Sequence, residues 1–154
     1  MSLDRRQLGQ IGLGALLGLG VASPAALWVA VDEDALVLAL CDALFPPVGD
    51  LPTAAAVDAP ARVRAYLDAL PARTRWEARG ALRLVEGRTL ATHGAPFSAL
   101  TREDREQVLI AMAGSALLPE RLLAQAVKQL CAMGYWQAPE TWAHLGYDGP
   151  WVGR

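Results

Sequence analysis

Residues 119–134 read PERLLAQAVKQLCAMG, and this stretch decides the fold class. Its apolar side chains return every three or four residues, a spacing that places them on one face of an α-helix. Proline is favoured in the first turn of a helix, so Pro119 marks the predicted start. Gly134 marks the predicted end, because glycine often terminates helices. The predicted buried face consists of Leu122, Leu123, Ala126, Val127, Leu130 and Cys131.

Four segments upstream of this stretch have the same helical spacing. Asp32 and Thr101 are predicted N-caps, and prolines or glycines follow the segments. In the longest segment the apolar positions include Trp76, Leu82 and Val85. No stretch alternates between apolar and polar residues over a strand's length, so the predicted fold is all-α, a compact bundle of about five helices behind an apolar N-terminal segment. The predicted helices cover residues 33–45, 61–70, 72–90, 102–113 and 119–134, with a loop at 48–59 and a short helical turn at 139–144.

The chain has 154 residues and a mass of 16.4 kDa, which suits one domain. Its formal net charge is -2 and its pI is about 5.6, and no aromatic residues are interleaved with its basic ones. Nucleic-acid binding is therefore not predicted. The hydrophobic residues are concentrated near the N-terminus, which divides the chain into an N-terminal segment, 1–31, and a helical domain, 32–154.

The N-terminal segment has the charge pattern of an export signal. Arg5 and Arg6 precede an apolar run from Leu8 to Val31, and three acidic residues follow it. Paired arginines before a moderately apolar, glycine-rich segment resemble the signal that the twin-arginine (Tat) translocase uses to export folded proteins. Asp4 stands where Ser or Thr is usual, and Leu8 replaces the favoured Phe. We therefore expect the protein in the periplasm or on the periplasmic face of the inner membrane.

The same apolar run is long enough to be a membrane anchor. A helix rises about 1.5 Å per residue, so the stretch from Leu8 to Val31 could cross a hydrocarbon core of roughly 30 Å. Val21-Ala22-Ser23 is the best candidate for a cleavage site. Residues 1–31 are thus interpreted either as a cleaved signal or as a retained anchor.

Residues that carry chemistry are sparse. His93 and His144 are the only histidines, and neither has a cysteine, an aspartate or a second histidine at metal-ligand spacing. No CxxCH motif for a c-type haem is present. We predict that the chain is not an enzyme and that it binds no metal or cofactor itself.

The two cysteines, Cys41 and Cys131, form no CxxC motif and lie in two apolar helical stretches. One interpretation is a pair of buried core thiols, since free cysteine is often fully buried. The other is a disulfide that joins the first and last core helices, which requires an oxidising compartment.

Three arginines, Arg75, Arg79 and Arg83, recur at i, i+4 and i+8, a spacing that places them on one helical face. They could bind an anionic partner, such as an acidic patch on another subunit. They could also form a solvated basic face with Glu77 and Glu86 nearby.

The C-terminal segment is rich in aromatic residues and resembles a known family. Its ordered features are Gly134-Tyr135-Trp136, Glu140, Trp142, Leu145-Gly146-Tyr147 and Gly149. This order is similar to the end of the gluconate 2-dehydrogenase subunit 3 family, the small or gamma subunit of flavin-dependent sugar and polyol dehydrogenases. The resemblance extends to Leu44-Phe45-Pro46-Pro47, to the step from Phe97 to Leu100-Thr101, and to the twin-arginine start.

The resemblance implies a non-catalytic subunit that carries the export signal and escorts a large flavoprotein of the glucose-methanol-choline type. It implies FAD in that partner subunit and, in many such complexes, a cytochrome c subunit with haem as a third component. The alternative is a membrane-tethered helical binding protein with no dehydrogenase partner.

The C-terminal aromatic residues have two interpretations. They could cap the helical core, where large rings bury much apolar area. They could also anchor a partner, because Trp and Tyr dominate interface hot spots. The residues concerned are Tyr135, Trp136, Trp142, Tyr147 and Trp151, and we favour partner contact for Trp151.

Overall fold

The structure, a computed structural model, describes residues 31–149 and contains no β-strand in that range. The prediction of an all-α fold is confirmed for these residues. Of the predicted N-terminal segment, only Val31 lies within them. The helices are α2 (Glu33–Leu44), α3 (Ala59–Ala69), α4 (Ala72–His93), α5 (Arg102–Ala113), α6 (Leu118–Trp136) and α7 (Pro139–Trp142), with 3₁₀ turns η3 (Phe97–Ala99) and η4 (Ala143–Leu145).

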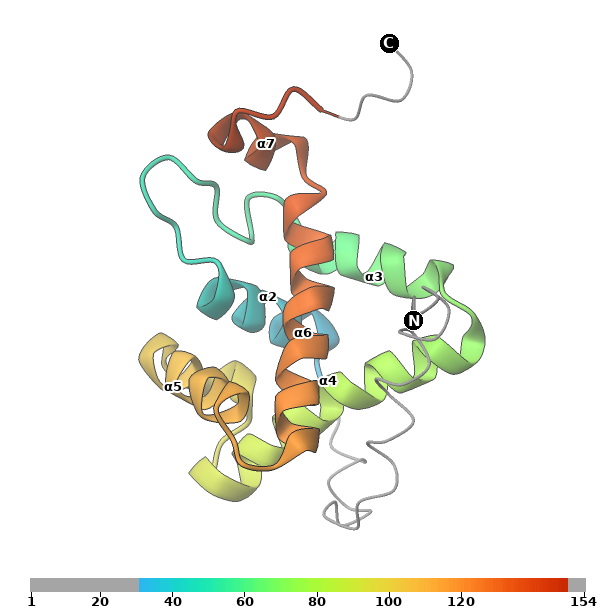
Figure 1. The fold of residues 1–154 in the computed structure, drawn as a ribbon, viewed down its shortest axis with the longest axis vertical. Coiled ribbons are helices and arrows are strands. Elements are labelled where there is room, and N and C mark those ends of the chain that lie inside the picture. The colour runs from blue at the N-terminus through green and yellow to red at the C-terminus, as the bar shows by residue number, and fades with distance from the viewer. Residues whose placement is uncertain (1–30, 150–154) are drawn as a thin grey trace, which may run out of the picture.

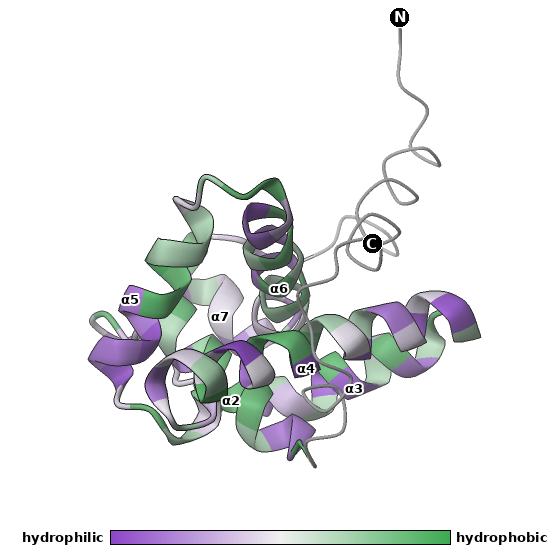
Figure 2. Cartoon of the chain, turned by 90° about the horizontal axis from the view of Figure 1, so that it is seen from below, coloured by the Kyte–Doolittle hydropathy of each residue, from purple (hydrophilic) through white to green (hydrophobic). Residues whose placement is uncertain are grey.

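Helix α6 is the centre of the bundle. Figure 1 shows it upright, with α2, α3, α4 and α5 grouped around it, and it packs against all four. Leu123, Val127 and Cys131 on its predicted apolar face are buried in the core. Figure 2 shows hydrophobic and hydrophilic positions mixed along single helices, so each helix contributes one apolar face to a shared core. None of the helices within residues 31–149 is long and apolar enough to cross a membrane.

Both predicted N-caps are confirmed. The Asp32 carboxylate accepts a hydrogen bond from the Ala35 backbone N–H at 3.1 Å, and the Thr101 hydroxyl accepts one from the Asp104 N–H at 3.2 Å. Each bond satisfies a backbone donor that has no partner inside its own helix. These local contacts fix where α2 and α5 begin.

The predicted end of α6 at Gly134 was wrong, because the helix continues to Trp136. Gly134 lies where α6 crosses α3. A Cβ at this position would overlap Val63 Cγ2 and would lie 3.1 Å from the Ala59 carbonyl oxygen. The glycine therefore permits a close approach of two helices and does not end one.

Helix α4 differs from its prediction in two respects. It continues past Leu90 to His93 and ends at Gly94, whose φ of +70° suits glycine at a helix C-terminus. Trp76, counted among its apolar positions, is 61% exposed, whereas Leu82 and Val85 are buried as predicted.

The loop between α2 and α3 is held by core contacts. Ala54 and Val57 are buried, and the Val57 carbonyl accepts a hydrogen bond from Arg62 Nε at 2.9 Å. The Pro52 carbonyl accepts a second one, from the Tyr135 hydroxyl at 2.6 Å. The segment from 48 to 58 is therefore anchored to the domain at Pro52, Ala54 and Val57, although it forms no helix.

Candidate functional site

The first aromatic group of the C-terminal segment is part of the core. Tyr135 is 1% exposed and stacks on Phe45 with ring centroids 4.9 Å apart, and Trp136 packs edge-on against both rings. Burial, with a smaller contribution from Cys41, raises the pKa of Tyr135. Its ring ties α6 to α2 and to the loop at Pro52, so Tyr135 is not on the surface that a partner would meet.

The second aromatic group closes the end of the bundle. Trp142 is half-buried, donates its Nε1–H to the Trp136 carbonyl at 2.9 Å, and meets Tyr147 edge-on at 5.5 Å. Tyr147 is 41% exposed and Leu145 is 59% exposed. The surface of this end therefore depends on Tyr147 and Leu145. The predicted partner contact of Trp151 lies outside the described residues.

The three arginines of α4 divide into a paired and an unpaired group. Arg79 forms an ion pair with Glu33 of α2 at 3.1 Å and with Asp68 of α3 at 3.4 Å. Arg75 donates to the Asp68 backbone carbonyl at 3.1 Å. Arg83 is exposed and forms no ion pair with any residue that the structure describes. Only Arg83 therefore keeps a charge that a partner could neutralise.

One acidic residue near these arginines is buried, contrary to the expectation from the sequence. Glu86, which one of the two interpretations placed beside a solvated basic face, is 3% exposed. Its carboxylate accepts a hydrogen bond from the Ser98 N–H at 3.3 Å and so holds η3 against α4. Glu77 pairs with Arg73 at 3.0 Å along the same helix.

The two cysteines are both fully buried and both present as free thiols. A hydrogen bond with Cys41, followed by burial, raises the pKa of Cys131 well above its ordinary value. The thiols of α2 and α6 are therefore neighbours in the core, which a disulfide would require and which the core-thiol interpretation permits. His93 and His144 are exposed, and no group of three potential metal ligands occurs within residues 31–149.

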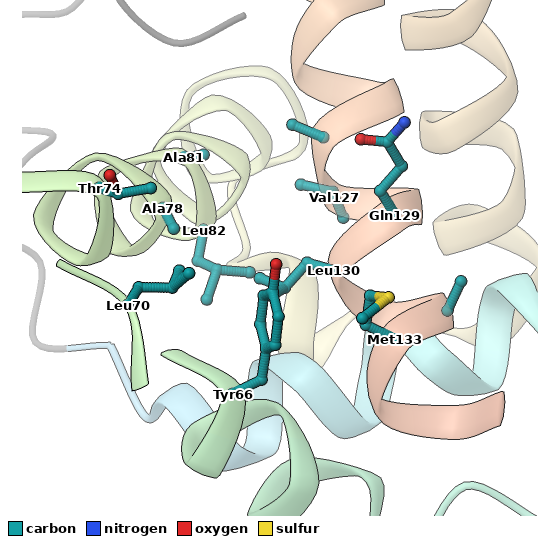
Figure 3. Close-up of a pocket in the computed structure, with 12 residues that line it drawn as sticks. Tyr66, Leu70, Thr74, Ala78, Ala81, Leu82, Val127, Gln129, Leu130 and Met133 are labelled. Atoms are coloured by element: carbon teal, nitrogen blue, oxygen red, sulfur yellow. The ribbon is translucent and has the colours of Figure 1, made fainter. Parts of the chain in front are cut away.

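An apolar cavity of about 520 Å³, which was not predicted from the sequence, lies between α3, α4 and α6. Figure 3 shows Tyr66 and Leu70 on one side of it, Ala78 and Leu82 of α4 on a second, and Met133 of α6 on a third. The only signal in the sequence is a set of alanines at inward positions, since a small side chain leaves space between crossing helices. Three neutral polar side chains, Tyr66, Thr74 and Gln129, join the lining, and no lysine or arginine does.

The comparison with family models decides the assignment. The model of gluconate 2-dehydrogenase subunit 3 matches residues 31–149, which is most of the chain. The chain belongs to the gluconate 2-dehydrogenase subunit 3 family. Membership indicates an accessory subunit of a multi-subunit dehydrogenase complex. Searches of curated proteins and of solved structures gave no match.

Proposed function

We propose that this chain is the non-catalytic small subunit of an exported FAD-dependent dehydrogenase that oxidises a sugar, a polyol or gluconate. The observation that carries the proposal is the family match over residues 31–149. The partner would be a large flavoprotein of the glucose-methanol-choline type, and a cytochrome c subunit could complete the complex. This chain would bind and stabilise the flavoprotein and would guide its export.

The proposal that the partner holds FAD rests on the family resemblance, and the chemistry of the cavity agrees with it. FAD carries a pyrophosphate, which proteins hold with backbone N–H groups at a helix N-terminus or with cationic side chains. The cavity between α3, α4 and α6 is mainly apolar and has no cationic side chain in its lining. This cavity does not fit FAD.

The export role rests on the N-terminal sequence. Arg5 and Arg6 precede the apolar run, as in signals for a translocase that carries folded proteins. A partner that folds around its flavin in the cytoplasm could cross with this subunit attached. The retained-anchor alternative leaves the assembled complex on the periplasmic face of the inner membrane.

Affinity capture from the native host tests the proposed assembly. The full chain carries a C-terminal tag, and the eluate is analysed by flavin absorbance and mass spectrometry. We expect a yellow eluate that contains a large flavoprotein in near-equal amount, and dye reduction with candidate sugars would then identify the substrate. A colourless eluate, repeated with an internal tag because the C-terminal tag lies near Trp151, would contradict the proposal.

Replacing Arg5 and Arg6 by lysine tests the escort role separately. We expect both this chain and the captured flavoprotein to remain in the cytoplasm, because paired arginines are what the translocase recognises. Unchanged export of the flavoprotein would refute the escort role, but it would not contradict the proposed assembly of the two subunits. Carbonate-resistant membrane association without a flavoprotein would favour the tethered binding protein.

A further inference from the structure

Helix α4 has an outward face that the packing of the domain does not explain. Trp76, Gly80 and Arg83 follow one another at i, i+4 and i+7, so they lie on one stripe, about 10 Å long at 1.5 Å per residue. The walls of the cavity, including Ala78 and Leu82, lie on another side of the same helix. We call this stripe of three residues the outer face of α4.

Trp76 is the first unusual member of the outer face. Its indole is 61% exposed and is the largest hydrophobic side chain that the described residues present to solvent. A single exposed hydrophobic residue is ordinary. Tryptophan is the residue type most enriched at binding hot spots, where its large ring fills a partner's pocket.

Gly80 is the second unusual member. Glycine inside a helix destabilises it by roughly 0.5–1 kcal/mol relative to alanine. At Gly134 the crossing of α3 requires a glycine, but a Cβ at Gly80 would have no heavy atom within 4 Å. No contact within the described residues therefore requires glycine at this position, and a surface that approaches the helix backbone from outside would require it.

Arg83 supplies the charge. Arg75 and Arg79 are compensated by Asp68 and Glu33, whereas Arg83 has no ion-pair partner among residues 31–149. An arginine at an interface pairs best with a carboxylate, to which it can donate two parallel hydrogen bonds. The complementary surface thus needs an acidic residue about 10 Å from a pocket for an indole, by the same helix rise.

We propose that the outer face of α4 is the surface through which this subunit binds its large flavoprotein, with Trp76 in an apolar pocket, Gly80 against the partner backbone and Arg83 paired with a carboxylate. The inference rests on the proposed function. The exposed apolar residue Ile110 lies on α5, away from this face, and serves as a control.

A competition experiment in the native host tests this surface. Wild-type and variant full chains carry different tags and are co-expressed, and their ratio in complex with the flavoprotein identified by capture is read by mass spectrometry. We expect the ratio of variant to wild-type chain in the complex to fall about 30-fold or more for Trp76→Ala, as at interface hot spots, and about 10-fold for Arg83→Glu. Ile110→Ala and Lys128→Glu, which change an exposed apolar residue and an exposed charge elsewhere, should compete equally with the wild type.

Gly80→Ala separates binding from folding. The methyl group has open space and alanine favours the helix, so the melting temperature should rise by a few degrees. The same methyl group should reduce the share of the variant in the complex about 10-fold, because it displaces a closely approaching surface. A structural role alone cannot produce higher stability together with weaker binding.

Three outcomes overturn the inference. The first is that Trp76→Ala, Gly80→Ala and Arg83→Glu compete as well as the control variants. The second is that these three variants still bind the flavoprotein but no longer float with phosphatidylglycerol vesicles in a density gradient. That result would show that the outer face of α4 binds a membrane. The third is that the wild-type chain captures no flavoprotein, in which case the proposed function fails first. Wild-type capture with unaffected variants refutes the surface alone.

Discussion

Replacing Gly134 with alanine tests how closely α6 approaches α3. The added Cβ would overlap Val63 Cγ2 and lie 3.1 Å from the Ala59 carbonyl oxygen. Overpacking of a core costs about 1–3 kcal/mol, and we expect the upper half of that range because one of the crowded atoms belongs to the backbone. The higher helix propensity of alanine offsets about 1 kcal/mol. The expected net loss of unfolding free energy is about 1–2 kcal/mol.

Gly80→Ala is the matched control, since it makes the same substitution inside a helix without a neighbour within 4 Å. It should stabilise the protein by about 0.5–1 kcal/mol. Thermal denaturation of the full chain, followed by circular dichroism, should give melting temperatures on opposite sides of the wild type. The expected fall for Gly134→Ala is roughly 3–10 °C.

A second variant locates the cause of that fall. Val63→Ala removes the methyl group that the new Cβ would meet, so the double variant should lose less stability than the sum of the single variants. A coupling of about 1 kcal/mol is expected. If Gly134→Ala is as stable as the wild type, the helices separate at little cost and the close-approach argument fails.

Three further predictions concern single side chains. Cys41 and Cys131 should resist alkylation in the native protein, because both are buried and because a hydrogen bond with Cys41, followed by burial, raises the pKa of the Cys131 thiol. After denaturation without reductant, two alkylated thiols would support the core-thiol interpretation and none the disulfide. Thr101→Ala should lower the unfolding free energy by about 1 kcal/mol in urea titration through loss of an N-cap, and an unchanged midpoint would contradict this. Hydrogen bonds from Ser115 and then from Arg88 lower the pKa of the Glu120 carboxyl below its ordinary value of 4.5. The ionised carboxylate therefore stabilises the folded protein fully above pH 4.5, and this contribution is lost as the pH falls through the pKa of the folded state. Glu120→Gln should therefore make the acid denaturation curve shallower, and an identical curve would exclude a contribution from this group.

The features that could be predicted from the sequence are those that depend on residues a few positions away along the chain. The N-caps at Asp32 and Thr101 need only residues three positions away, so the local sequence contains all the information. The apolar spacing of α6 predicted three buried residues, Leu123, Val127 and Cys131, for the same reason, whereas Leu122, Ala126 and Leu130 of the predicted face are only half-buried. The all-α class follows from such local signals repeated along the chain.

The errors concern residues whose role depends on a distant segment. Gly134 resembles a helix stop until α3 is placed against it. Glu86 resembles a surface acid until η3 brings the Ser98 N–H to its carboxylate. Trp76 has helical spacing with the core positions of α4 but lies outside their arc. The role of each of these residues depends on packing between segments that are far apart in the chain, and the residue pattern of a single sequence does not reveal that packing.

Packing and backbone conformation explain several positions of the C-terminal motif that carried the family resemblance. Gly134 permits the crossing of α3, and Tyr135 stacks on Phe45. Gly146 has a φ of +64°, and a Cβ at Gly149 would lie 3.1 Å from the Trp142 ring. These four positions are constrained by the fold, so their presence in the motif identifies the domain and does not mark a binding surface.

Because these motif residues serve the fold, a partner site should be sought elsewhere on the domain. The aromatic residues that looked most suitable for recognition bury much of their area within the domain, and only Tyr147 among the described ones is exposed. A recognition surface instead combines an exposed apolar side chain, a charged side chain without an ion-pair partner, and a glycine that the packing of the domain does not require. Within residues 31–149 the outer face of α4 has all three, in Trp76, Arg83 and Gly80.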